Sequence, residues 1–200
     1  MVLAPAHDVQ RSMTFNSINI QQLYRSVSKD YMKEVAGAQS GLLGASSDAI
    51  CQHMHGLSLD GAHVLSMATL AAILSGVCNA KWLEALEASV PGASARAVVT
   101  KTVADFCIAG VIANSLYLIG VPALTDLYGG ASLVDTLATA SSGWTVEGFR
   151  AVMLIELCTF GPYNLCAFRL VPPRLRPLSA ATVSATCAVA LSGVTLGFGV

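Results

Sequence analysis

Three carboxylates lie inside apolar stretches of this sequence, where a charge is costly and therefore informative. Asp48, Asp105 and Glu156 each occupy a segment with few or no other charged residues. A carboxylate at membrane depth rarely faces lipid; it faces the interior of a helix bundle, a partner charge or a water path. One interpretation is a polar lining or gate, with Lys101 or Arg176 as counter-charge. The alternative is a hydrogen bond that fixes helix register, and Glu156 could equally face a partner protein.

A set of candidate polar residues follows from this reasoning. The candidate lining or helix-register residues from this reasoning are Asp48, Lys101, Asp105, Glu156 and Arg176.

A metal site and an enzymatic centre are not indicated. The metal-like cluster is Cys51, His53, His55 and His63. Positions i and i+2 face different sides of a helix, so His53 and His55 could chelate together only in a loop; interfacial or hydrogen-bonded histidines are the simpler interpretation. The sequence holds no phosphate loop, dinucleotide fingerprint, nucleophile elbow or HExxH motif. We therefore expect no metal, no cofactor, no catalytic residues and no enzymatic activity.

Composition excludes other classes of protein. Hydrophobic residues make up 54% of the chain and charged residues 12%, against about 25% charged residues in soluble domains. The net charge of −1 does not indicate a nucleic-acid partner. The six cysteines stand singly in apolar stretches without a CxxC motif, which favours small hydrophobic side chains over a disulfide framework.

Long apolar segments would position the candidate residues. No Asp, Glu, Lys or Arg occurs from Pro177 to Val200, and a helix over that stretch is roughly 36 Å long, enough to cross a hydrocarbon core of roughly 30 Å. We predict an all-α, multi-pass transmembrane helix bundle with four to five spans. The predicted spans are 36–54, 61–80, 102–121, 148–168 and 178–198, forming one domain over 36–200.

Small residues at four-residue spacing predict close packing between these helices. Such a stripe lets two backbones approach within lipid, and Gly37 with Gly41 forms a GxxxG motif. The predicted packing residues are Gly37, Gly41 and Ala45; Ala68, Ala72 and Gly76; and Ala180, Ser184, Ala188 and Ser192.

Residues 1–35 differ from the rest. Residues 1–17 are polar, and 19–35 has the three- and four-residue periodicity of an amphipathic helix. That helix could lie in the membrane interface or dock on the end of the bundle.

Basic residues predict the orientation. With five spans, ten of the eleven Lys and Arg residues fall on the side of the N-terminus, and the other side receives only Arg150. This asymmetry is why 36–54 is counted as a span. Trp82 and Trp144 fall at span ends and are predicted to be interface anchors.

Spaced residues over roughly 24–192 resemble a known family, that of the mitochondrial inner-membrane protein Mpv-seventeen and the twenty-two-kilodalton peroxisomal membrane protein. The matching positions are Tyr24, Gly41-Leu42-Leu43, Asp48 and Gln52; Gly76 and Trp82; Pro91-Gly92, Lys101 and Asp105; Phe168, Val171-Pro172 and Arg176; and Leu191-Ser192. The chain departs from the pattern at Ser47, Val77 and Phe106, where the family has Gly, Pro and Gln.

The resemblance implies a non-catalytic integral membrane protein of an organelle. It also adds Gln52, which matches a polar position of the family, as the sixth candidate lining or helix-register residue. Members of that family are proposed to form weakly selective channels for small solutes. The implied location is the mitochondrial inner membrane with the N-terminus on the matrix side, or alternatively the peroxisomal membrane. A second hypothesis is an accessory structural subunit of a larger membrane complex, such as a respiratory-chain assembly. The expected partners are the lipid bilayer and either further copies of the chain or other subunits.

Overall fold

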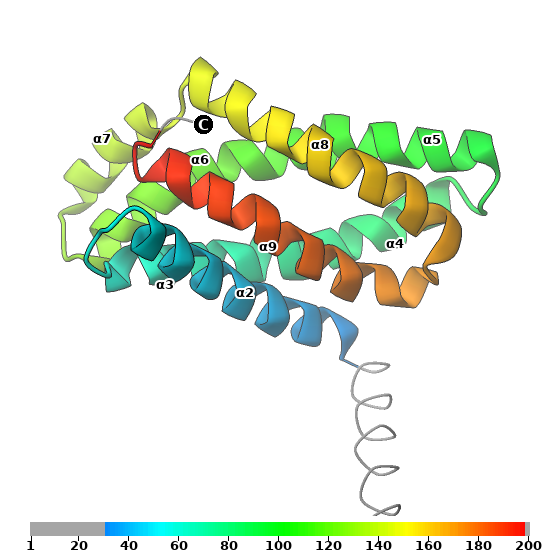
Figure 1. Ribbon diagram of the computed structural model, residues 1–200, viewed down its shortest axis with the longest axis horizontal. Helices are drawn as coiled ribbons and strands as arrows, with labels where there is room; N and C mark the ends of the chain where they lie inside the picture. Colours follow the sequence, from blue (N-terminus) through cyan, green and yellow to red (C-terminus); the bar gives the residue numbers. More distant parts are fainter. Residues whose placement is uncertain (1–30, 199–200) are drawn as a thin grey trace, which may run out of the picture. The chain divides into compact units, whose positions relative to one another are not determined.

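The computed structural model describes residues 31–198, and every regular element in that range is a helix (Figure 1). The chain forms two units, Met1–Met32 and Lys33–Val200, and the second holds the helices described below. The predicted amphipathic helix over 19–35 lies almost wholly outside the described residues. Its last residues belong to the first described helix, α2.

The described residues form eleven helical segments. In order they are α2 (Met32–Met54), α3 (Gly61–Leu70), η1 (Ala71–Cys78), α4 (Asn79–Ser89), α5 (Ala95–Ala104), η2 (Asp105–Gly110), α6 (Val111–Tyr128), α7 (Leu133–Gly143), α8 (Val146–Leu170), η3 (Pro173–Leu175) and α9 (Arg176–Thr195). The segments η1 and η2 are π-helical. They join their neighbours into two continuous long helices, Gly61–Ser89 and Ala95–Tyr128.

Side chains at the turns determine where several helices begin. The carboxylate of Asp60 accepts hydrogen bonds from the backbone N–H groups of Ala62 and His63 at the start of α3. Ser94 and Thr145 cap α5 and α8 in the same manner. Such caps satisfy N–H groups that lack a partner within the helix.

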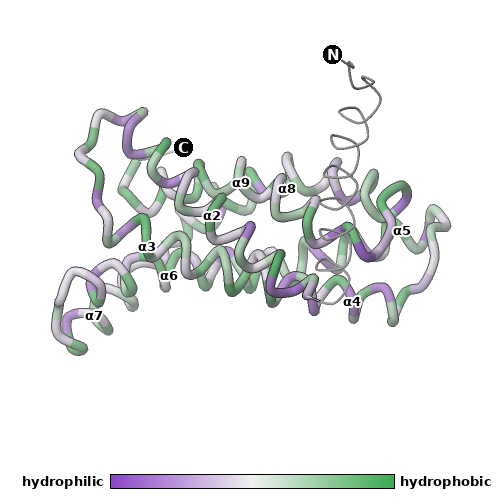
Figure 2. Tube along the Cα trace, turned by 90° about the horizontal axis from the view of Figure 1, so that it is seen from below, coloured by the Kyte–Doolittle hydropathy of each residue, from purple (hydrophilic) through white to green (hydrophobic). Residues whose placement is uncertain are grey.

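Four helices are long and apolar enough to cross a membrane: Gly61–Ser89, Ala95–Tyr128, Val146–Leu170 and Pro173–Thr195. Figure 2 shows long stretches of these helices in hydrophobic or weakly polar colours. The predicted all-α, multi-pass bundle is thereby confirmed. The helix α2 covers the predicted span 36–54 but is not among the four, because its Ser, Gly, Gln and Asp residues make it less apolar. A fifth span therefore stays a prediction that rests on the distribution of basic residues.

The helix α7 was not predicted from the sequence. It follows Ser132, whose hydroxyl accepts the N–H of Asp135, and it packs against α6. Gly143 permits this contact, since a Cβ there would lie 2.5 Å from the carbonyl oxygen of Leu118. At eleven residues α7 is too short to span a bilayer, and its Ser and Thr residues resemble those of a loop.

The glycines of α2 bring it close to the long helix Gly61–Ser89. A Cβ at Gly76 would collide with the backbone of Gly37, and a Cβ at Gly44 would lie 2.6 Å from the Cβ of Ala71. A Cβ at Gly41 would lie 3.2 Å from that of Ala72. The small residues at these positions let α2 pack backbone against backbone on η1 and α3.

The remaining packing residues have more varied surroundings. The carbonyl oxygen of Ala68 also faces Gly41, and Ala45 is half-buried. On α9, Ala180 and Ser192 are buried, whereas Ser184 and Ala188 are half-buried and line a cavity described below.

Two apolar clusters hold the long helices together. One contains Met67, Tyr117, Val121, Val152 and Leu191, from α3, α6, α8 and α9. The other contains Leu83, Leu86, Val98 and Phe168, from α4, α5 and α8. Two of the candidate polar residues, Lys101 and Arg176, lie over the ring of Phe168 in the second cluster.

Candidate functional site

Asp48 is the centre of a buried network that joins three helices. Its side chain is fully buried, and Gln52 donates to its Oδ2 at 2.8 Å. His63 of α3 places Nδ1 2.8 Å from Asp48 Oδ1, and the hydroxyl of Ser192 on α9 donates to the same oxygen. Every oxygen of this carboxylate therefore has a partner. This geometry matches the helix-register interpretation of Asp48 and Gln52.

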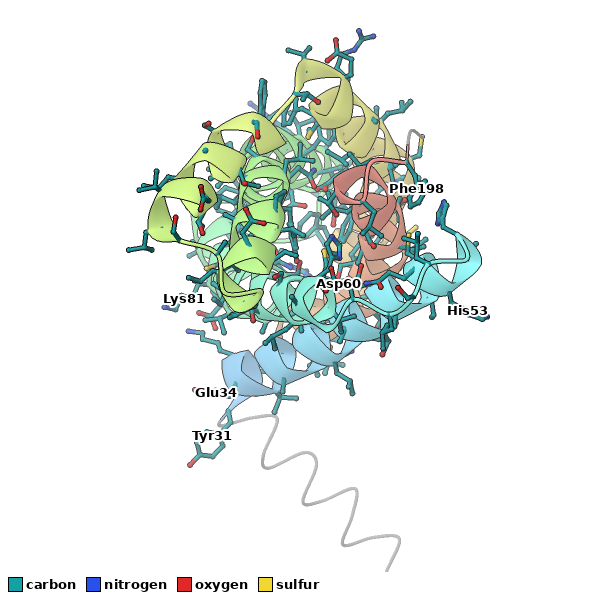
Figure 3. The ribbon with its side chains drawn as sticks, turned by 90° about the vertical axis from the view of Figure 1, so that its left-hand side faces the viewer. Tyr31, Glu34, His53, Asp60, Lys81 and Phe198 are labelled. Carbon is teal, nitrogen blue, oxygen red and sulfur yellow. The ribbon has the colours of Figure 1, made fainter. Side chains whose placement is uncertain are left out.

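The four metal-like residues do not meet at one point, although Cys51 Sγ lies 3.7 Å from His55 Nδ1. His63 binds Asp48, and His55 stacks on Phe198 with ring centroids 3.9 Å apart. The exposed side chain of His53 lies at the periphery, as do those of Glu34 and Lys81 (Figure 3). Within residues 31–198 no three His, Cys, Asp or Glu side chains are grouped to hold a metal ion.

Lys101 and Arg176 share one carboxylate, that of Glu87. The ammonium of Lys101 is fully buried and donates to Glu87 Oε2 at 2.6 Å and to the carbonyl oxygen of Gly92 at 2.8 Å. The guanidinium of Arg176 also donates to Glu87 Oε2, and its Nε and Nη2 donate to the carbonyl oxygens of Val171 and Phe168. Glu87, rather than a carboxylate of the apolar stretches, is thus the counter-charge of both cations.

Gly92 shapes this cation site. It occupies the turn between α4 and α5 with φ of +90°, a conformation that favours glycine. Its carbonyl oxygen accepts from Lys101, and its N–H donates to Glu87 Oε1 at 3.2 Å. The turn therefore holds both members of the ion pair.

A cavity of about 290 Å³ lies between the long helices. Its wall includes residues of α2, η1, α4, η2, α6, α8 and α9, so both π-helical segments contribute to it. Most of the lining is apolar. The polar and aromatic residues on the wall are Ser40, Ser75, Asn79, Trp82, Asp105, Asn114, Tyr117, Glu156, Phe160 and Ser184. π-Helical segments are rare and occur frequently at functional sites, which makes this cavity the candidate site.

Asp105 and Glu156 both line the cavity. The indole N–H of Trp82 donates to Asp105 Oδ1 at 2.7 Å, and the amide of Asn164 donates to Oδ2 at 2.6 Å. The amide of Asn114 donates to Glu156 Oε2 at 2.8 Å. These donors are neutral, so they orient the two carboxylates without neutralising them.

No cation pairs with either cavity carboxylate among the residues that the structure describes. The ion pairs over 31–198 are Lys33–Glu84, Lys101–Glu87 and Arg176–Glu87, and His63 contacts Asp48 through its Nδ1. The described cavity wall itself contains no Lys, Arg or His. Asp105 and Glu156 therefore line this space without a counter-charge among the described residues.

Ser40 of α2 adds a further polar group to the wall. Its side chain is 1% exposed, and its Oγ has no hydrogen-bond partner among residues 31–198. Ser46 and Ser66, in contrast, each donate to the carbonyl oxygen one helical turn earlier. Because the Oγ of Ser40 is itself closed to solvent, a molecule in the cavity reaches it only when the wall shifts slightly.

The structure thus separates the six candidate polar residues into three groups. Asp105 and Glu156 share the cavity, Asp48 and Gln52 form the register network, and Lys101 and Arg176 share Glu87. Trp144 is partly exposed at the start of α8 and packs on Phe149, with ring centroids 5.4 Å apart. Trp82, by contrast, directs its indole N–H inward onto Asp105.

Several residues of these groups were not singled out from the sequence. Asn114 lies within an apolar span, which is itself a signal, because a polar amide at membrane depth needs a partner. Ser40 and Glu87 gave no comparable signal, since serine is common in such helices and Glu87 lies at a helix end.

Comparisons with known proteins assign no family. No protein-family model matches the chain, and no solved structure matches it either. Membership in the family that the sequence resembles therefore stays a prediction.

Proposed function

We propose that this integral membrane protein is a non-catalytic conduit for small solutes, located in the mitochondrial inner membrane. The observation that carries the proposal is the cavity between its apolar helices, lined by Asp105 and Glu156. Intramembrane ionisable residues that face a bundle interior typically mark solute or ion pathways. The spacing of residues that resembles the Mpv-seventeen family supports the same function and location.

The cavity has one wall that differs from the others. Ser40 and Gly44 of α2 line it, and α2 is the least apolar of the long helices. Glycine contacts hold it to η1 and α3, and the Asp48 network ties it to α3 and α9. In this proposal α2 closes one side of the solute path.

Conductance measurements test the proposal. We expect purified protein in planar lipid bilayers to conduct small ions. A double variant, Asp105→Asn with Glu156→Gln, should conduct with a smaller preference for cations, because both substitutions remove a wall charge while keeping side-chain size. Glu147→Gln makes the same chemical change at an exposed position of α8 and should leave ion preference unaltered. Protein that keeps its helical circular-dichroism spectrum yet shows no conductance would contradict the proposal.

A second candidate function is that of an accessory subunit in a larger membrane complex. It is favoured by α7, whose Leu133, Val134 and Leu137 are 71%, 77% and 70% exposed on a helix too short to cross the bilayer. A native gel of mildly solubilised membranes, with mass spectrometry of the band, tests it. Co-migration with a large complex at fixed stoichiometry supports this candidate, and a small self-contained oligomer argues against it.

A further inference from the structure

We propose that the cavity binds a monovalent organic cation, namely a protonated primary amine with an apolar body. Asp105 and Glu156 would hold the ammonium group, with Ser40 as a third polar contact. The inference rests on the proposed conduit function, which identifies the cavity as the site. It adds the class of solute that the cavity accepts.

The charge of the site is the first argument. Both carboxylates belong to helices of membrane-spanning length and face a space whose described wall lacks basic side chains. An uncompensated carboxylate away from water is strongly disfavoured. Elsewhere in the described residues, the buried Asp48 has His63 as its partner, and the ion-paired Glu87 has two cations. A bound cation would supply the partner that Asp105 and Glu156 lack.

The hydroxyl of Ser40 is a second, independent argument. Ser40 lines the cavity and is almost fully buried, and its Oγ, which is closed to solvent, has no hydrogen-bond partner among the described residues. Buried polar groups in proteins are nearly always hydrogen-bonded, and an exception indicates a missing partner. The hydroxyl oxygen can accept an N–H from an ammonium group. A quaternary ammonium, which has no N–H, would leave it without a donor.

The rest of the wall favours an organic cation over a bare metal ion. Trp82, Tyr117 and Phe160 contribute aromatic surface, and most other lining side chains are aliphatic. Aromatic faces attract organic ammonium groups, whereas Ca²⁺ and Mg²⁺ prefer six or more oxygen ligands, waters included. The volume of about 290 Å³ is close to the lower end of the roughly 300–1,000 Å³ typical of small-molecule pockets.

The test is calorimetric titration of the purified full chain in phosphatidylcholine nanodiscs. The probe is 2-phenylethylammonium, compared with its neutral analogue 2-phenylethanol and with the anion 3-phenylpropionate. We expect the ammonium to bind at least tenfold more tightly than the alcohol and the anion not to bind. Equal binding of ammonium and alcohol, preferential binding of the anion, or no binding at all would overturn the inference.

Variants locate the binding. Glu156→Gln and Asp105→Asn should each weaken ammonium binding at least tenfold, and Ser40→Ala should weaken it by a smaller factor. Glu147→Gln, which lies outside the cavity on the same helix as Glu156, should bind as the parent does. Because Asp105→Asn also alters the contacts of Trp82 and Asn164, Glu156→Gln carries the test if that variant does not fold. Unchanged affinity in Glu156→Gln would refute the assignment.

The same titration distinguishes a lipid headgroup from a free amine as the natural ammonium. Together with the conductance measurement, it also tests the binding site and the conduit function independently. Phosphatidylethanolamine added to the nanodiscs will compete with the probe if the natural ammonium is a lipid headgroup, and will not if it is a free amine; either result supports an ammonium site. Binding without bilayer conductance would refute the conduit and leave the site standing. Conductance without ammonium binding would do the reverse.

Discussion

Replacing Glu87 by Gln should destabilise the protein more than any other single charge removal in its ion-pair network. Glu87 Oε2 is the shared acceptor of Lys101 and Arg176, which are buried. The variant therefore leaves two neighbouring cations without a carboxylate. Removing one partner of a buried ion pair typically costs about 3–5 kcal/mol. Because the side chain of Glu87 is 25% exposed and water can partly replace it, we expect about 2–4 kcal/mol.

The neighbouring Glu84 supplies a matched control. It also lies on α4 and also pairs with a lysine, Lys33, at 2.8 Å, but the two side chains are 60% and 37% exposed. Exposed ion pairs contribute about 0–1 kcal/mol. Glu84→Gln should therefore change the free energy of unfolding by less than about 1 kcal/mol, although the chemical substitution is identical.

The charges that remain after each substitution predict which variant of the network is destabilised more. Lys101→Met leaves Glu87 with Arg176 as a balanced pair, whereas Glu87→Gln leaves two like charges. We expect Lys101→Met to cost less than Glu87→Gln, about 1–2 kcal/mol after the loss of its bond to Gly92. The assay is reversible unfolding in mixed micelles with increasing sodium dodecyl sulfate, followed by circular dichroism. Equal losses for Glu87→Gln and Glu84→Gln, or a larger loss for Lys101→Met, would refute this reasoning.

Two further predictions concern the packing and hydrogen bonding of α2. Gly76→Ala should destabilise the protein by about 2 kcal/mol or more, because the new Cβ would meet the backbone of Gly37. A Cβ at Gly61 would meet nothing within 4 Å, so Gly61→Ala should be neutral or slightly stabilising in the same unfolding assay. Asp48→Asn should cost about 1–3 kcal/mol, since an amide cannot accept at both of its terminal atoms. The exposed Asp135 accepts from the hydroxyl of Ser132 in the first turn of α7, and Asp135→Asn should cost less than about 1 kcal/mol; a similar loss in both variants would contradict the register role.

The sequence predicted the membrane-spanning helices well because their signal is local. Long runs without charged residues have few alternative structures in a membrane, where every backbone polar group must be satisfied within the chain. The predicted spans 61–80 and 102–121 nevertheless belong to longer helices, Gly61–Ser89 and Ala95–Tyr128. Charged residues at their ends, such as Glu87 and Lys101, reduced the local hydropathy but pair with each other in the fold.

The candidate site was predictable only in part, because grouping depends on tertiary contacts. Asp48, Asp105 and Glu156 carry the same sequence signal, an acid within an apolar stretch. Their difference lies in what comes near them from elsewhere in the described chain: a histidine and a serine reach Asp48, an indole and an amide reach Asp105, and one amide reaches Glu156. Hydropathy and spacing carry no information about such partners.

That difference is the reason to look for function at the cavity. Among the described residues, the other carboxylates within the bundle have several partners each: Glu87 pairs with two cations, and Asp48 has three side-chain partners. A fold selected for stability alone would gain nothing from Asp105 and Glu156 facing an interior space, since apolar residues of similar volume are often at least as stable as buried charges. The cost of keeping both carboxylates in the wall of one cavity, which Ser40 also lines, is explained by a cationic molecule that enters that cavity.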